Sequence, residues 1–355
     1  MPASAYEKVY EKLRQEIISG VLPFGTRLPG KRPLSEQYGV SVPTVAHALD
    51  MLADEGFIQL RERSGSYVSY QSTDDFHGVE PPYSFSPLQE QRSSVDVDGF
   101  PFTVLARTMR RVISEQENQL LLKTPNQGLL SFRQALSRYL SRSRGIIADP
   151  EQIVVGAGAE YLYGQLVETL GVNHVWAIES PSYEKIEQVY SSRHVKLDPL
   201  PLCRNGIRSE ALWRSDATIL HISPYRSFPS NVTASASKRA EYLRWGARPG
   251  HIIIEDDFES EFSIRHKPMD TLFSQSGLQN VIYLNTFSRT ISSAIRTGYM
   301  VLPATILPLY LQNAGFYSCT VPAFEQYVLA ELIDSGDFER HIRRVRRKLR
   351  AALGL

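Results

Sequence analysis

The sequence contains very little cysteine: Cys203 and Cys319 are the only two among 355 residues. Two cysteines cannot build a disulfide framework or a zinc site, so we expect a reducing compartment and no metal site. An excess of charge is also missing, because 39 Lys and Arg residues face 38 Asp and Glu residues, a formal net charge of +1. Bulk electrostatics therefore gives no reason to expect nucleic acid or acidic lipid as a partner.

A membrane-spanning segment is missing as well. Residues 297–324 carry no charge, but Pro303, Pro308 and Pro322 interrupt them, whereas a spanning helix needs about 20 predominantly apolar residues. The N-terminus has no apolar core of the kind found in signal peptides. We therefore expect a soluble, cytoplasmic protein with no membrane partner, and the length predicts two domains.

Residues 5–68 show the pattern of three short helices followed by a hairpin. Apolar side chains recur at three- and four-residue spacing in the first helix, which Gly20 ends, and Ser41 and Pro43 are typical of the start of the third, which Gly56 ends. The predicted elements are helices at residues 6–18, 34–38 and 42–55 and strands at residues 57–60 and 67–70. This is the order of a winged helix-turn-helix, which we assign to residues 1–70.

The rest of the chain has a different pattern. Residues 71–93 are rich in Ser, Asp, Pro and Gly, which predicts a linker. From residue 94 to the end, helical stretches alternate with compact apolar runs at residues 153–155, 175–178, 218–222, 251–254 and 281–284. Continuous apolar strands with helices between them predict a mostly parallel sheet covered on both faces. The expected fold class is therefore α/β, with the winged helix-turn-helix in front of this sheet domain.

The N-terminal unit resembles the GntR-type winged helix. Four stretches carry the resemblance, at residues 25–32, 39–45, 48–58 and 64–68. It implies that the third helix enters the major groove of double-stranded DNA with its first residues at base edges, while nearby cations contact phosphates. The DNA-binding positions that we assign on this basis are Lys31, Arg32, Ser41, Thr44, His47, Arg61, Arg63 and Gly65.

Two features of this unit depart from the expectation of a strong DNA reader. The family usually has Arg where Val42 stands, so we expect discrimination at that base to be weaker by about 1–3 kcal/mol, and Ala46 offers no polar group. Eight Lys and Arg residues are balanced by eight Asp and Glu residues. The alternative is a winged helix that contacts proteins. We favour DNA because the cations cluster beside the turn and the wing, while several acids lie along the first helix.

The large domain resembles a fold type I aminotransferase of class I/II, fused to the winged helix as in MocR-type regulators. The resemblance begins near residue 85 and rests on five stretches in the family's order, at residues 128–133, 156–160, 179–183, 255–262 and 286–299. It implies a pocket for pyridoxal 5′-phosphate at the ends of the strands.

The phosphate of that cofactor is assigned to two groups of residues. Gly158 and Ala159 follow a strand and open a helix, so their backbone amides can receive a phosphate. By the resemblance, Thr286, Ser288 and Arg296 hold it from the other side. A glycine-rich turn taken alone is equally a tight strand-to-helix corner, and a lone Arg is usually a surface residue.

The pyridine ring is assigned to three further positions. Asp256, at the end of an apolar strand, matches the carboxylate that pairs with the protonated ring nitrogen. Tyr183 matches the ring that stacks on the pyridine. Phe258 stands where the family has a Tyr whose hydroxyl reaches the ring oxygen. The alternatives are a helix cap for the acid and ordinary packing for the Tyr.

Arg289 stands where the family's Schiff-base lysine should be. A lysine can lose its proton and attack an aldehyde, whereas arginine stays protonated. We therefore expect no catalytic residue and no internal aldimine, and pyridoxal phosphate, if it binds, to be held only non-covalently. Residues 225–231 also differ from the stretch usually found there.

The C-terminal end of the sequence departs from the family as well. The chain stops at Leu355, after a basic helix with six Arg and Lys residues between positions 343 and 350, where the family continues into a small subdomain. We expect the domain at residues 94–355 to be C-terminally truncated, either naturally or by a cut. We interpret the basic run as a solvated helix face rather than a second DNA contact.

The function expected from these features is transcriptional regulation by a MocR-type, DNA-binding homodimer that is not an enzyme. Its aminotransferase-like domain serves dimerisation and binds a small-molecule effector, amino-acid-like or phosphorylated. An alternative from another class is a pyridoxal-phosphate-dependent aminotransferase, which requires Lys at position 289. A third is a remnant that cannot dimerise without its C-terminal subdomain.

Overall fold

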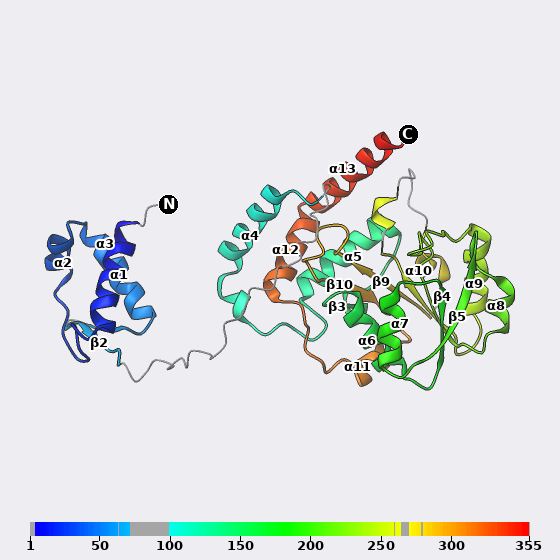
Figure 1. Cartoon of the computed structure of the whole chain (residues 1–355), viewed down its shortest axis with the longest axis horizontal. Coiled ribbons are helices and arrows are strands. Elements are labelled where there is room, and N and C mark those ends of the chain that lie inside the picture. Colours follow the sequence, from blue (N-terminus) through cyan, green and yellow to red (C-terminus); the bar gives the residue numbers. More distant parts are fainter. Residues whose placement is uncertain are drawn as a thin grey trace, which may run out of the picture. The chain divides into compact units, whose positions relative to one another are not determined.

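The computed structural model describes residues 4–62, 64–71, 99–258, 260–263, 270–277 and 280–354. The chain divides into two compact units, residues 1–91 and 92–355 (Figure 1). Most of the predicted linker, and with it the predicted boundary at residue 93, lies outside the described residues. In the described part of the chain, no helix is both long and apolar enough to cross a bilayer.

The N-terminal unit has the predicted order of three helices and a hairpin (Figure 1). Its elements are α1 (Ala5–Ile18), α2 (Lys31–Tyr38), α3 (Val42–Asp54), β1 (Ile58–Arg61) and β2 (Gly65–Val68). Its core is formed by α1 and α3 around the fully buried Val45 and Leu52. Several bounds differ from the prediction by one to three residues, most of all at α2 and β2. The helix α2 begins three residues earlier because Pro33 lies in its first turn, where no backbone N–H is needed. The strand β2 begins at Gly65, opposite Arg61.

The large unit is a three-layer α/β domain with one eight-stranded sheet in the order β3-β10-β9-β8-β7-β4-β5-β6. Its strands are β3 (Ile153–Gly156), β4 (Val175–Ser180), β5 (Lys196–Cys203), β6 (Gly206–Ile207), β7 (Ile219–Ile222), β8 (Ile252–Asp256), β9 (Val281–Thr286) and β10 (Gly298–Val301). Its α-helices are α4 (Phe102–Gln116), α5 (Leu130–Arg144), α6 (Ala159–Leu170), α7 (Glu184–Ser192), α8 (Ser209–Arg214), α9 (Ala236–Gly246), α10 (Leu272–Ser276), α11 (Leu307–Asn313), α12 (Ala323–Asp334) and α13 (Asp337–Ala352).

The sheet is mostly parallel, as predicted, and both of its faces are covered. The antiparallel strands are β10, between β3 and β9, and the edge strand β6. Successive side chains of a strand point to opposite faces, so Ile254 packs with α6 and α7, whereas Ile253 packs with α9 and α10. Below, the side of the sheet covered by α6, α7 and α11 is called the α6 face, and the other side the α5 face.

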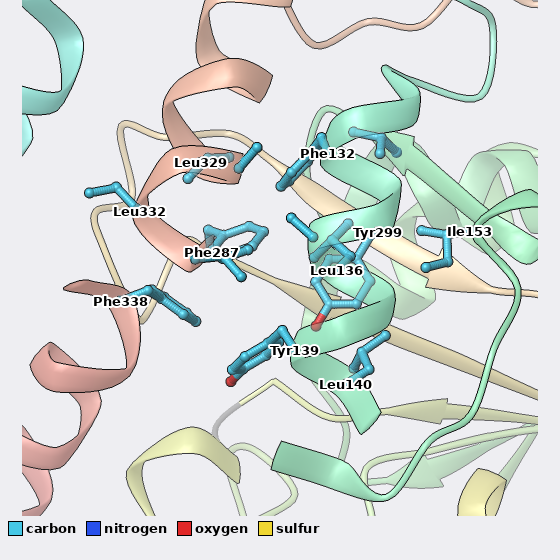
Figure 2. Close-up of a cluster of buried hydrophobic side chains, with 14 of the residues drawn as sticks. Phe132, Leu136, Tyr139, Leu140, Ile153, Phe287, Tyr299, Leu329, Leu332 and Phe338 are labelled. Carbon is cyan, nitrogen blue, oxygen red and sulfur yellow. The ribbon is translucent and has the colours of Figure 1, made fainter. Parts of the chain in front are cut away.

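The main core of the α5 face lies where α5, α12 and α13 meet the sheet. Phe132, Leu136 and Tyr139 of α5 are at most 2% exposed, and they pack with Leu329 of α12 and Phe338 of α13. Figure 2 shows these side chains converging between α5 and α12 around the ring of Phe287. This packing fixes α5 against the end of β9, where the predicted phosphate-binding turn begins.

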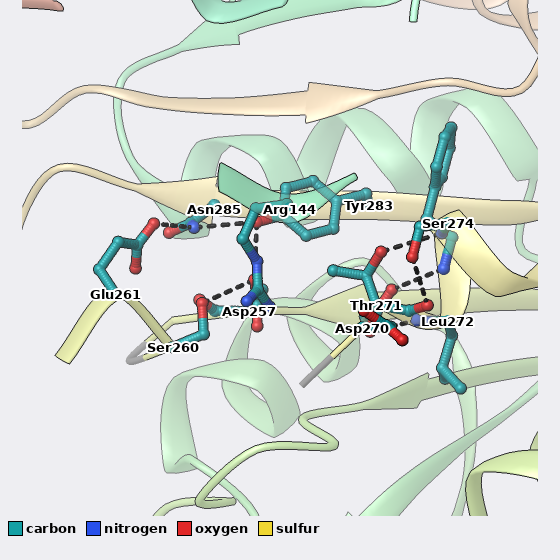
Figure 3. A network of polar contacts seen from close by, with 12 residues as sticks. Arg144, Asp257, Ser260, Glu261, Asp270, Thr271, Leu272, Ser274, Tyr283 and Asn285 are labelled. Atoms are coloured by element: carbon teal, nitrogen blue, oxygen red, sulfur yellow. Dashed lines mark hydrogen bonds and ion pairs between the residues drawn. The ribbon is translucent and has the colours of Figure 1, made fainter. Parts of the chain in front are cut away.

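A buried polar network lies at the end of the same face (Figure 3). Arg144, the last residue of α5, forms an ion pair of 2.5 Å with Asp257, which also accepts a hydrogen bond of 2.7 Å from Tyr283. Asn285 donates to Tyr283 and to Glu261, at 3.1 and 2.6 Å. These contacts join the end of α5 and the strand β9 to Asp257 and Glu261, two described acids that follow β8.

The basic helix α13 is only partly the solvated face that the sequence suggested. Phe338, Ile342 and Val345 bury one side of it. Arg346 is part-buried and donates from Nε to the backbone carbonyl of Glu261 at 2.5 Å, while Arg343 and Arg347 are exposed. The interpretation is corrected for Arg346, which anchors α13 to the loop after β8.

The core predicts the effect of a truncation in α5. Leu136→Ala should lower the free energy of unfolding of the large unit by about 2–5 kcal/mol. The side chain is fully buried, so its truncation removes apolar contacts and leaves a cavity that the surrounding core fills only partly. All three tryptophans lie in this unit, so urea unfolding followed by tryptophan fluorescence reports on it alone. The matched control is Ile147→Ala, at a side chain that is 89% exposed. Equal losses for the two variants would contradict the placement of Leu136 in the core.

Candidate functional site

The polar side chains predicted to read DNA gather on the first two turns of α3. Ser41 is its N-cap: the Ser41 Oγ accepts a hydrogen bond of 3.3 Å from the Thr44 amide and lies 2.7 Å from the Thr44 hydroxyl. His47 is exposed one turn further on, and the ring of Tyr6 meets its ring edge-on at 4.5 Å between centroids. A helix start with its cap formed and its polar groups outward has the form of a recognition helix.

The predicted phosphate contacts are exposed cations on either side of that helix. Lys31 and Arg32 open α2, and Arg61 ends β1 with its guanidinium 4.6 Å from the centroid of the Tyr67 ring. Arg63 lies outside the described residues. Stacking on Tyr67 holds the Arg61 charge at the wing.

Sequence reasoning missed a further cation at the wing, Arg27. Gly65 has φ +116°, and a Cβ placed on it would lie 3.2 Å from the Arg27 Nε, so the Arg27 side chain lies directly against the turn. Arg27 also forms a backbone bridge with Tyr67. A signal was present, because Arg27 stands within the motif at residues 25–32, but nothing local places it beside residue 65.

In the large unit, the predicted phosphate positions of α6 meet a positive charge. Gly158 is the N-cap of α6 with φ +85°, followed by Ala159. A Cβ on Gly158 would lie 3.7 Å from the Arg296 Nη2, so the guanidinium lies beside the first turn. Arg296 pairs with Glu160 at 3.4 Å and remains exposed. The amide dipoles of the helix start and the Arg296 charge both favour an anion here.

The turn after β9 is brought to the same place by the sheet. Gly298 of β10 pairs with Gly156, which ends β3, and with Thr286, which ends β9. The Thr286 Oγ1 is buried and has no hydrogen-bond partner among the described residues. Ser288 is half-buried in the turn, and Arg289 is exposed there. An unpartnered buried hydroxyl beside a helix start is unusual in a folded protein, and a phosphate oxygen is one group that would accept from it.

The residues assigned to the ring lie at or after the ends of two strands, β8 and β4, which β7 separates. Asp256 is 4% exposed, and its Oδ2 accepts a hydrogen bond of 2.5 Å from the Tyr163 hydroxyl. Tyr183, after β4, is 39% exposed and meets the ring of Phe228 edge-on at 6.0 Å. Burial raises the pKa of Tyr183, the Glu160 carboxylate raises it further, and Arg296 lowers it. Tyr183 therefore lies near the residues at the start of α6. Phe258 is exposed to the same extent as Tyr183 and has no hydroxyl to offer.

A buried carboxyl, Glu179, supports the loop that follows β7. Its Oε2 accepts hydrogen bonds from the Ser227 hydroxyl at 2.6 Å and from the Ser223 amide at 3.1 Å. Burial raises the pKa of Glu179 to about 7, although both hydrogen bonds act in the opposite direction. The group thus titrates near neutral pH inside the protein.

Sequence reasoning also missed a cluster on the α6 face next to Asp256. His221 of β7 is 2% exposed, and its Nδ1 lies 2.7 Å from the hydroxyl of Tyr190 on α7. Its Nε2 lies 3.7 Å from the Asp256 Oδ2, and the ring of Tyr163 packs against it edge-on at 5.1 Å. A polar residue inside the apolar run at residues 218–222 was the available signal.

Two family models match the chain. The gntR family of bacterial regulatory proteins matches residues 5–68, and aminotransferase class I and II matches residues 93–353. The second match covers most of the chain. The chain belongs to the aminotransferase class I and II family.

Relatives of this chain match it over both the N-terminal and the aminotransferase domain. It is 28% identical over 356 residues to the uncharacterized HTH-type transcriptional regulator YdeL of Bacillus subtilis, covering 97% of this chain and 76% of YdeL. It is 28% identical to the probable rhizopine catabolism regulatory protein MocR of Rhizobium meliloti, with 96% and 74% covered. It is also 28% identical to the pyridoxine biosynthesis regulator PdxR of Corynebacterium glutamicum, with 98% and 77% covered. A GntR-type domain in front of an aminotransferase domain is the MocR-type architecture.

Solved structures of aminotransferases share the fold of the large unit. An archaeal alanine:glyoxylate aminotransferase aligns with a TM-score of 0.64 at 22% identity, covering 69% of this chain and 63% of that chain. The kynurenine aminotransferase of Pyrococcus horikoshii aligns with the same score and identity, covering 70% and 64%. At this identity the likeness shows the fold alone, and the chain spans less than two thirds of these enzymes.

The aminotransferase fold family depends on pyridoxal phosphate, and most of this pocket fits that group. Two features fit a phosphate. The Thr286 hydroxyl is buried without a partner among the described residues, and Gly158, which has no side chain, lies beside Arg296. The buried Asp256 provides a carboxylate for a ring nitrogen. The predicted departure is at position 289, where Arg stands at the position that the resemblance assigns to the family's lysine.

Glu179 predicts a pH dependence of stability. Because its pKa is raised to about 7 from 4.5, the folded state keeps a proton that the unfolded state has released between these values. The free energy of unfolding should therefore fall as pH rises from about 4.5 to 7, by up to about 3 kcal/mol from this group. Glu179→Gln, which can still accept both hydrogen bonds, should remove that part of the slope in urea unfolding at a series of pH values. The exposed control Glu187→Gln should keep it. An unchanged slope for Glu179→Gln would show that the carboxyl is not held neutral.

Proposed function

We propose that this chain is a DNA-binding transcriptional regulator of MocR type. The observation that carries the proposal is the arrangement of the N-terminal unit: an N-capped α3 with outward polar groups, flanked by exposed cations at α2 and at the wing. The net charge of the whole chain is close to zero, so DNA binding depends on this local clustering.

Within that surface, two roles are proposed. Arg27, Arg32 and Arg61 contact phosphates, because their exposed charges neutralise the backbone of any sequence. Thr44 and His47 contact base edges, because they lie at the start of the helix that enters the major groove. Residues 1–70 form the DNA-binding domain in this proposal, and residues 94–355 form the regulatory domain.

The large domain is proposed to bind pyridoxal phosphate, or another phosphorylated ring, without a covalent bond. Gly158, Ala159, Thr286, Ser288 and Arg296 bind the phosphate, and Asp256 and Tyr183 bind the ring. Bound pyridoxal phosphate supplies an electron-poor ring and an aldehyde. The Arg289 guanidinium stays protonated and cannot attack that aldehyde, so it binds anionic groups instead.

The proposal includes a homodimer that responds to a small-molecule effector, amino-acid-like or phosphorylated. Large apolar side chains of the large unit remain exposed in the single chain, among them Phe102, Leu121 and Phe316 at 77, 84 and 65%. A second copy would cover such groups, and a two-fold dimer matches paired half-sites on DNA. We place the protein in the cytoplasm, where bacterial DNA is accessible.

The competing function is that of a pyridoxal-phosphate-dependent aminotransferase. It is disfavoured by Arg289 and by Phe258, which lacks the hydroxyl that family enzymes direct to the ring oxygen. The exposed cations of the N-terminal unit have no role in that reaction.

The DNA-binding roles predict two kinds of mutational effect. Arg32→Ala and Arg61→Ala should weaken binding to all duplexes alike and reduce the salt dependence of log K by roughly 0.9 per lost phosphate contact. Thr44→Ala and His47→Ala should weaken binding to a selected duplex by about 1–3 kcal/mol while leaving random DNA nearly unchanged. Anisotropy titrations at several salt concentrations measure both, with a duplex selected by the full chain from a random pool.

The matched control is Lys8→Ala, at an exposed residue of α1 outside the predicted surface. It should leave both affinities unchanged. Equal losses on selected and random DNA for Thr44→Ala and His47→Ala would refute the assignment of base contacts.

The cofactor proposal predicts binding without covalent attachment. Pyridoxal phosphate should bind in equilibrium dialysis, whereas borohydride treatment should add no cofactor mass and amino donors with keto acids should show no transamination above the free-cofactor rate. Arg289→Lys should restore the trapped mass, because it supplies an amine that can lose its proton.

The control for that substitution is Arg289→Met, which removes the charge without adding an amine and should trap nothing. A trapped adduct in the unmodified chain would contradict the proposal. Failure of Arg289→Lys to react would mean that Phe258, which lacks the hydroxyl of the family's Tyr, already prevents the reaction.

A further inference from the structure

The carboxylate that would bind a ring nitrogen is supported from behind by a buried cluster of three side chains. Tyr163, Tyr190 and His221 come from α6, α7 and β7, and each is at most 2% exposed. The hydroxyl of Tyr163 and the Nε2 of His221 approach the same oxygen of Asp256, Oδ2, at 2.5 and 3.7 Å. The cluster lies on the α6 face because residues 221 and 256 have the same strand orientation as Ile219 and Ile254.

The direction of the hydrogen bonds in this cluster follows from the chemistry of its members. Burial and then the neighbouring Asp256 raise the pKa of Tyr163, so its hydroxyl keeps the proton and donates to the carboxylate. Burial and Asp256 also raise the pKa of Tyr190, so it too keeps its proton, and the His221 Nδ1 is its partner at 2.7 Å. If Tyr190 donates, Nδ1 carries the lone pair and the ring hydrogen lies on Nε2, facing Asp256.

The distance of 3.7 Å between Nε2 and Oδ2 is too long for a hydrogen bond. Nε2 is moreover buried without a hydrogen-bond partner among the described residues. A polar atom left in this state costs free energy, and a small shift of the carboxylate would satisfy it. The cluster therefore directs two groups toward Oδ2 of Asp256: the Tyr163 hydroxyl and, with hydrogen on Nε2, the His221 ring.

We propose that His221 is a positioning residue which, with Tyr163 and Tyr190, holds the Oδ2 of Asp256 so that Oδ1 accepts a hydrogen bond from a protonated pyridine nitrogen. The inference rests on the proposed binding of pyridoxal phosphate and adds a selectivity to it. The pocket distinguishes a ligand with a ring nitrogen from the same ligand with carbon at that position, and His221 controls this preference without contacting the ligand.

The test measures the affinities of the purified full chain for pyridoxal phosphate and for its 1-deaza analogue, which has carbon in place of the ring nitrogen. The unmodified chain should prefer the nitrogen ring. His221→Phe, which keeps an aromatic ring but removes both nitrogens, should reduce this preference by about tenfold, or roughly 1.4 kcal/mol. His221→Gln should restore much of it, because its amide nitrogen is near the position of Nε2.

The matched control is His341→Phe, at another histidine that is only 3% exposed but lies on α13, against Phe100. It should leave the preference unchanged. Two results would overturn the role of His221: an unmodified chain that binds both rings equally, or a His221→Phe variant with an unchanged preference. Either result would leave the proposal of non-covalent cofactor binding intact. A chain that binds neither ring overturns both proposals.

A second measurement uses the unmodified chain, so it needs neither a ligand nor a variant that must fold. Nitrogen-15 spectra of the histidine-labelled, unmodified chain report which ring nitrogen of His221 carries hydrogen. Hydrogen on Nε2 supports the proposal. A lone pair on Nε2 overturns it, because that lone pair would repel the carboxylate that it faces.

Discussion

Three consecutive acids, Glu255, Asp256 and Asp257, end the central part of the sheet, and all three are buried. Successive residues of an extended chain face opposite sides, so Asp256 points to the α6 face, whereas Glu255 and Asp257 point to the α5 face and meet different partners there. Glu255 accepts from the first amides of α10, Asp256 from Tyr163 on the α6 face, and Asp257 pairs with Arg144 on the α5 face. Asp256 and Asp257 thus have partners in different layers, whereas burial and the neighbouring Asp257 raise the pKa of Glu255 to about 7. These contacts fix the end of β8, around which the pocket is built.

The proposed ligand site combines positions for a ring and a phosphate with an arginine at the position predicted for the family's lysine. Asp256 and Thr286 end neighbouring parallel strands, and the pairing of Gly298 with Thr286 and Gly156 brings the start of α6 beside them. None of these positions depends on residue 289. The predicted exchange of lysine for Arg289 would remove the amine and leave the proposed donors for a phosphate in place.

The fold was largely predictable, and the misses have physical reasons. The five predicted strands are continuous apolar runs. Four of them lie in the parallel part of the sheet, and β3 pairs antiparallel with β10 at one edge. The strand β5 was missed because Pro199 and Pro201 interrupt its apolar pattern. The prolines are tolerated because β6 pairs with only the last two residues of β5, which leaves most of that side of β5 without a neighbouring strand. The strand β10 was missed because it inserts antiparallel between β3 and β9, an order that no local pattern encodes.

The sequence by itself determined the order of the two domains and the Ser41 cap of α3, and it predicted the phosphate-binding turn and an arginine at the family's lysine position. All of these are contiguous motifs, in which the chemistry depends on neighbours along the chain. Only the tertiary structure decided that Arg27 lies against the wing, and that His221 and Tyr163 lie behind Asp256. These contacts join residues 35 to 93 positions apart, and such pairs become neighbours only when strands align in a sheet and helices pack across it.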